Sequence, residues 1–188
     1  MTVRFFLLLA CQLFLALTCA TAQAAEGIEI TRASIEASDD GYRLSAAYSF
    51  DLTPGLEQAI EHGVALSFTT EIELTRPRWW WWTDDHAVSS RRTTKLNYDV
   101  LLRVYHVSSP GSIQQNFDTL DDALRAIRLP ARWLIAAKGA LKPGETYNVT
   151  LRMFMDREFL LKPLQIDAFN NSDWRLASHK KTFTYRAE

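Results

Sequence analysis

The sequence predicts a mainly β protein, an antiparallel immunoglobulin-like β-sandwich with two short helices. Several segments alternate apolar and polar residues with a period of two, which is typical of strands with one buried face. Turn-forming Gly and Pro residues separate these segments at short spacings. Two other segments combine helix-capping residues with apolar residues at helical spacing. Because the strands are apolar on one face only, an antiparallel sandwich is favoured over a buried parallel sheet.

The predicted strands follow one another along most of the chain. The first two, 28–36 and 42–50, are joined at Gly41, which can adopt the positive φ of a tight hairpin turn. The clearest alternation runs from Val64 to Leu74, with the apolar residues at even positions. The remaining strands are predicted at 96–104, 113–117, 147–155 and around 183–185.

Capping residues set the bounds of the two predicted helices. Thr53 can cap the first helix, with Pro54 at its first position and Gly63 just beyond its end. Thr119 can cap the second helix, which must end before Pro130. The apolar residues expected on the buried sides are Leu56, Ala59 and Ile60 in the first helix, and Leu120, Leu124 and Ile127 in the second.

The first 24 residues have the features of a secretory signal peptide. Arg4 provides the positive start, 5–17 is an apolar run, and Ala22-Gln23-Ala24 fits a small-x-small cleavage site. We therefore predict cleavage after Ala24, leaving residues 25–188 as one β-sandwich domain in the periplasm. The alternatives are a leader retained as a membrane anchor and lipidation at a leader cysteine.

Removal of the leader changes the chemistry open to the chain. Both cysteines, Cys11 and Cys19, leave with it, so the mature chain has neither disulfides nor thiol chemistry. Arg4 leaves as well, so 20 Lys and Arg remain against 22 Asp and Glu, a net charge of -2. This balance argues against nucleic acid as a partner. No later apolar run reaches membrane-spanning length, so a soluble mature protein is expected.

No motif for catalysis, a metal or a cofactor stands out. The chain lacks a Gly-x-Ser-x-Gly elbow, a phosphate-binding glycine loop and a dinucleotide fingerprint. Its four histidines are far apart, and Asp84-Asp85-His86 is read as an ordinary loop rather than a metal site. The sequence therefore predicts a non-catalytic protein without a cofactor, although carboxylate pairs remote in sequence stay open.

The most unusual stretch contains two arginines and four consecutive tryptophans. Its residues are Arg76, Arg78, Trp79, Trp80, Trp81 and Trp82. If the preceding strand continues through it, two indoles point to each side. Either all four rings are packed, or one pair forms an outward aromatic platform for a protein or a sugar. A membrane-interface belt is a third interpretation.

Several segments together resemble a family of uncharacterised bacterial envelope proteins, domain of unknown function 4390. The similar segments are 74–82, 91–98, 120–124, 141–147, 162–166 and 173–174. The resemblance implies no activity, cofactor or catalytic residue. In some proteobacteria the family's genes neighbour a sensor kinase and response regulator pair of the nitrogen-regulation type, which implies a role in envelope signalling.

The function predicted from the sequence is binding. We expect an exported periplasmic adaptor that contacts an unidentified periplasmic protein, such as a sensor kinase ectodomain, through the segment from Arg76 to Trp82. The alternatives are a glycan-binding or glycan-processing envelope protein, and a purely structural domain with every tryptophan buried.

Overall fold

The structure is a computed structural model that describes residues 27–76, 85–160, 162, 164–165 and 171–188. Strands dominate this part of the chain. The elements are β1 (Glu29–Ser38), β2 (Gly41–Ser49), α2 (Pro54–Glu61), β3 (Leu66–Arg76), β4 (Asp85–Asp99), β5 (Val104–Ser108), β6 (Gln115–Phe117), α3 (Leu120–Arg128), β7 (Trp133–Ala137), β8 (Thr146–Met155), η1 (Arg157–Phe159), η2 (Ser172–Trp174) and β9 (Lys181–Arg186).

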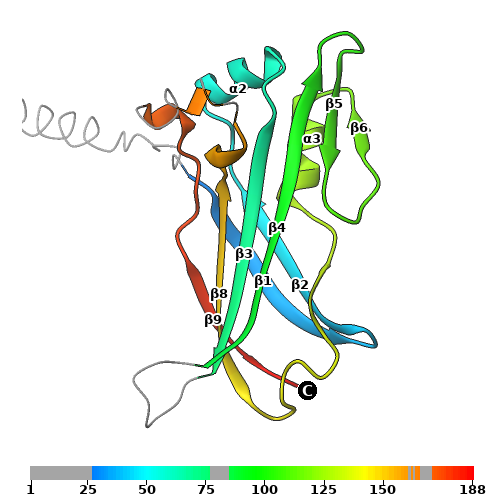
Figure 1. Cartoon of the computed structure of the whole chain (residues 1–188), viewed down its shortest axis with the longest axis vertical. Coiled ribbons are helices and arrows are strands. Elements are labelled where there is room, and N and C mark those ends of the chain that lie inside the picture. The colour runs from blue at the N-terminus through cyan, green and yellow to red at the C-terminus, as the bar shows by residue number, and fades with distance from the viewer. Residues whose placement is uncertain (1–26, 77–84, 161, 163, 166–170) are drawn as a thin grey trace, which may run out of the picture.

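The strands form two antiparallel sheets. The smaller has the order β1-β2-β7 and the larger the order β6-β5-β4-β3-β8-β9. In Figure 1, β1 and β2 run obliquely behind the larger sheet, α3 lies on that same side, and α2 lies at one end of the long axis. The prediction of a mainly β protein with two antiparallel sheets and two short α-helices is confirmed.

The core lies between the sheets and is built from the alternating apolar positions. On β3, Phe68, Ile72 and Leu74 are at most 1% exposed, as their even positions predict. All five inward positions of β8, from Tyr147 to Met155, are buried as well. The central strands of the larger sheet therefore supply much of the apolar packing that holds the protein together.

Both helices begin at the predicted caps. The Thr53 hydroxyl accepts a hydrogen bond from the Leu56 backbone N–H at 3.3 Å, and the Thr119 hydroxyl accepts one from the Asp122 N–H at 3.2 Å. The buried residues are Leu56, Ala59 and Ile60 in α2, and Ala123, Leu124 and Ile127 in α3. Each helix is thus fixed by one cap and one apolar face.

The predicted strand at 96–104 is wrong in both of its bounds. β4 begins eleven residues earlier, at Asp85, and ends at Asp99. The chain then turns, with a 2.7 Å hydrogen bond from the Arg103 N–H to the Asp99 carbonyl, and returns as β5. The apolar–polar alternation runs through this turn, and no Gly or Pro interrupts it, so no local pattern indicates the reversal.

Two smaller differences concern short strands. The strand expected at 113–117 begins only at Gln115, and Ile113 is 90% exposed in the preceding loop. β7 was not predicted, because all five of its residues are apolar and show no alternation, although only Ile135 is buried. Among the described residues, no helix combines the length and apolar character needed to cross a membrane.

Candidate binding cleft between the sheets

The segment predicted as the binding site lies almost wholly outside the described residues. Of its members only Arg76 is described, as the last residue of β3, where it pairs in register with Asp85 of β4. Arg78 and Trp79 to Trp82 fall within the gap 77–84, so the interpretations of this segment remain predictions.

A different site is formed on the inner face of β4. Antiparallel pairing with β3 points Val88 and Leu96 into the core, because they lie opposite Leu74 and Leu66. Between these ends, the inward positions hold three polar residues, Ser90, Arg92 and Thr94. The core of the sandwich is therefore interrupted at the middle of this central strand by an arginine.

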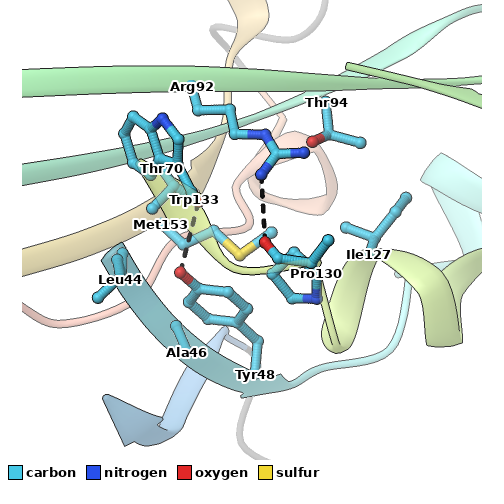
Figure 2. Close-up of a pocket in the computed structure, with 11 residues that line it drawn as sticks. Leu44, Ala46, Tyr48, Thr70, Arg92, Thr94, Ile127, Pro130, Trp133 and Met153 are labelled. Atoms are coloured by element: carbon cyan, nitrogen blue, oxygen red, sulfur yellow. Dashed lines mark hydrogen bonds between the residues drawn. The ribbon is translucent and has the colours of Figure 1, made fainter. Parts of the chain in front are cut away.

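Arg92 projects into a narrow cleft between the two sheets (Figure 2). One wall comes from the larger sheet and the other from the smaller sheet and the end of α3. The space in the cleft that a water-sized molecule can enter is about 20 Å³, within about 380 Å³ of unfilled space that includes solvent at the open mouth. Its lining residues are Leu44, Ala46, Tyr48, Thr70, Arg92, Thr94, Ile127, Pro130, Ala131, Trp133 and Met153.

The Arg92 guanidinium has no carboxylate partner among the described residues. Within that part of the chain it donates one hydrogen bond, from Nη1 to the Ala131 carbonyl oxygen at 3.3 Å. A guanidinium carries five N–H donors, so four are left over. None of its nitrogens is a fully buried atom without a partner in the described chain, so the donors that make no hydrogen bond there reach solvent-accessible space.

Burial also affects how the cleft's charged and phenolic groups titrate. Burial lowers the pKa of Arg92, which nevertheless stays protonated at neutral pH. The charge of the Tyr48 phenolate has the opposite, smaller effect on this pKa. Burial raises the pKa of Tyr48, against the lowering effects of its hydrogen bond with Thr70 and of the Arg92 charge. The cleft therefore contains one cation and one neutral phenol.

The other polar groups of the cleft are few and mostly paired. The Tyr48 and Thr70 hydroxyl oxygens are 3.5 Å apart, and Thr94 Oγ1 lies 2.8 Å from Ser109 Oγ. The remaining walls are largely aliphatic and aromatic, with Trp133 at the smaller sheet. Such a cleft combines a cation with apolar walls, the two features that recognise an anion carried on an apolar group.

This site was not predicted from the sequence, although one signal was present. Arg92 lies an even number of residues from Leu96, so on a strand both side chains point to the same face. A charged residue at an inward strand position marks either a break in the core or a binding group. Its neighbours Trp133 and Ala131 are about forty positions away in sequence, and no local pattern connects them to it.

No metal centre is formed by the described residues, among which no group of three or more His, Cys, Asp or Glu side chains is placed to hold an ion. His106 lies in a polar cluster on the hairpin of β5 and β6, with Nδ1 2.7 Å from Asn116 Oδ1. Its Nε2 is 4.0 Å from an Asp99 oxygen. This cluster ties neighbouring strands together.

The fold and the cleft define a class of protein: a β-sandwich-like domain with a single cation in an apolar cleft between its sheets. The chain belongs to the family described as Domain of unknown function (DUF4390), whose model matches residues 25–184. No curated protein and no solved structure matches the chain. Membership of this family, expected from the sequence, is thereby shown.

Proposed function

We propose that this is an exported, non-catalytic binding protein of the periplasm, and that its cleft receives a carboxylate on a slender apolar stem. The observation that carries the proposal is Arg92, a half-buried guanidinium with no carboxylate partner in the described chain. Keeping a cation in an apolar cleft costs desolvation energy. An anionic ligand would offset that cost and use the remaining donors.

The shape of the site favours a carboxylate over a phosphate. A guanidinium offers parallel N–H donors that match the two oxygens of a carboxylate. The cleft is narrow and holds one cation, which suits a planar monoanion better than a bulkier group of higher charge. The aliphatic and indole walls then pack against the stem of the ligand. The carboxylate can belong to a free acid or to the end of a partner's chain.

Titration with a simple pair of probes tests the proposal. We expect residues 25–188 to bind hexanoate with a dissociation constant on the order of millimolar, as suits so small a ligand. The alcohol 1-hexanol should bind at least about tenfold more weakly, because it lacks the charge-assisted hydrogen bonds. Comparing an acetylated Ala-Leu peptide with its C-terminal amide asks whether a chain end serves equally well.

Two matched variants assign the binding to the cleft. Arg92→Met keeps the length of the side chain but removes the charge, and should weaken hexanoate binding by about tenfold or more. Arg91→Met removes the neighbouring charge on the opposite face, where Arg91 bonds Glu71, and should leave binding unchanged. Equal affinity of the acid and the alcohol, or equal loss in both variants, would contradict the proposal.

A protein partner is proposed at the tryptophan segment, on the grounds of its sequence. Indoles and arginines are the side chains that most often carry binding energy at protein interfaces. A sensor kinase ectodomain of the periplasm is the partner to test first. Loss of its binding in Trp80→Ala or Trp81→Ala, with an unchanged melting temperature, would support this contact. Unchanged binding in both variants would count against it.

A further inference from the structure

The turn between β4 and β5 exposes three consecutive aliphatic residues. The exposed fractions are 57% for Val100, 94% for Leu101 and 68% for Leu102. We call these three residues the apolar tip. Isolated exposed leucines are common on protein surfaces, but a consecutive run at the end of a hairpin is a contiguous apolar patch.

Hydrogen bonds hold the apolar tip outward. Asp99 Oδ1 accepts from the backbone N–H groups of Leu101 and Leu102, both at 2.9 Å. The turn closes with Arg103 at a φ of 56°, in the left-handed region that side chains other than glycine seldom adopt. The backbone of the tip is thus fixed by local contacts, and its side chains do not fold back onto the core.

The position of the tip suits contact with a surface outside the protein. In Figure 1 the β4–β5 hairpin projects at the same end of the long axis as α2. The described chain also starts toward this end. The Ile28 N–H donates a hydrogen bond to the carbonyl of Ala177, which follows η2 closely in sequence, and η2 packs against α2. If the chain is exported as proposed, this is the end that follows the leader, and after cleavage only a contact made by the protein itself would keep it at the membrane.

We propose that the apolar tip inserts into the interfacial region of a phospholipid bilayer. Weighted by their exposed fractions, the three aliphatic side chains offer on the order of 130–260 Å² of apolar area. A stable protein interface needs about 800 Å² per partner, far more than the tip provides. A bilayer needs no complementary surface, so a small protruding tip suffices for weak, reversible binding.

The charged residues near the apolar tip indicate that its attraction to a bilayer is hydrophobic rather than electrostatic. Burial is the main cause that raises the pKa of Tyr105 on β5, and smaller rises come from Tyr98 and from the exposed Glu61 and Glu57 of α2, which places these two carboxylates on the side of this hairpin. One basic residue, Arg103, follows the tip directly. Anionic lipid should therefore not strengthen the binding, unlike the case of a basic amphipathic helix.

Vesicle sedimentation with residues 25–188, which contain every described element, tests this proposal. We expect measurable binding to phosphatidylcholine vesicles at millimolar lipid, and no increase when phosphatidylglycerol is added. The double variant Leu101→Asp/Leu102→Asp should lower the partition coefficient on the order of 100-fold. Ile113→Asp is the matched control, because Ile113 is 90% exposed in a different loop and its loss should leave binding unchanged.

Site-specific labelling gives an independent readout. The mature chain contains no cysteine, so Leu101→Cys and Ile113→Cys each create a unique attachment site for an environment-sensitive fluorophore. The label at position 101 should shift to the blue on adding vesicles, and the label at position 113 should not. Absence of binding by the unaltered chain, or equal binding by the double variant, would overturn the proposal. Concentration-dependent self-association lost in the double variant would assign the tip to a second copy instead.

Discussion

Arg91 and Arg92 are adjacent on β4 but have opposite surroundings, because successive strand residues point to opposite faces. Arg91 lies on the outer face, where its Nε donates to Glu71 Oε1 at 2.9 Å. That hydrogen bond raises the pKa of Arg91, whereas burial lowers the pKa of Arg92. Arg92 faces the cleft without a carboxylate among the described residues. An arginine satisfied within its own protein is best explained as structural, and one left with spare donors in a cleft as a binding group.

The outer face around Arg91 supports the structural interpretation of that residue. Its guanidinium carbon lies 6.0 Å from the centre of the Phe154 ring, and that of Arg152 lies 5.0 Å from the same centre. Opposite charge and aromatic contact thus occupy Arg91 on a solvent-facing surface, where such interactions contribute little to stability. The difference between the inner and outer faces of β4 leads to three predictions, in order of decreasing expected effect.

The largest effect should come from truncating an inner residue of β4. Leu96 is fully buried, so Leu96→Ala should lower the free energy of unfolding by about 2–5 kcal/mol through lost burial and a cavity. Lys95→Ala, on the exposed outer face of the same strand, should change it by less than about 0.5 kcal/mol. Urea unfolding measures both. Similar losses in the two variants would mean that β4 does not separate an inner from an outer face as described.

The two helix caps should have equal effects on stability but unequal effects on binding. Thr119→Ala and Thr53→Ala each remove a capping hydroxyl and should cost about 1 kcal/mol of unfolding free energy. α3 contributes Ile127 to the cleft, whereas α2 contributes no lining residue. Hexanoate affinity should therefore fall in Thr119→Ala alone, which calorimetry can measure. A comparable fall in Thr53→Ala would show that binding tracks overall stability.

The smallest effect concerns the titration of Tyr48. Because burial raises its pKa, the folded protein retains the phenolic proton at a pH where the unfolded chain has begun to lose it. The stability linked to Tyr48 is therefore complete below about pH 10, the ordinary tyrosine pKa, and falls as the pH rises above that value. Arg92→Met should raise the pKa further by removing a stabilising positive charge, and Arg91→Met should not.

Nuclear magnetic resonance of ¹³Cζ-labelled tyrosine follows this titration at the single residue. The Tyr48 resonance is assigned by its absence in Tyr48→Phe. If the Tyr48 pKa moves equally in the two arginine variants, or in neither, the charge of Arg92 does not act within the cleft as described.

The sequence predicted the strands whose inner positions are consistently apolar. β8 is the clearest case, because its five inward residues are all apolar and all buried. β4 was largely missed since its inward Ser90, Arg92 and Thr94 hide the alternation. The apolar–polar alternation then extended the predicted strand wrongly through Val100 and Leu102. The turn there is made by Asp99 and Arg103 and contains no Gly or Pro to mark it.

The cleft could not be predicted for a different reason. It depends on how far the smaller sheet covers the larger one, which brings β7 next to β4 although the two strands are distant in sequence and in different sheets. Arg92 meets Ala131 and Trp133 only through that packing. Local periodicity carries no information on such contacts, while the helix caps depend on neighbouring residues alone and were predicted correctly.

The side-chain Nε–Hε resonances of Arg91 and Arg92 provide the most direct test of the central claim. They are followed in a ¹⁵N-labelled protein while hexanoate is added, with each resonance assigned by its absence in the corresponding methionine variant. We expect the Arg92 signal to shift and saturate with the affinity found by calorimetry, while the Arg91 signal stays in place and 1-hexanol moves neither. Equal shifts of both signals, or no shift of the Arg92 signal at saturation, would contradict a carboxylate site in the cleft.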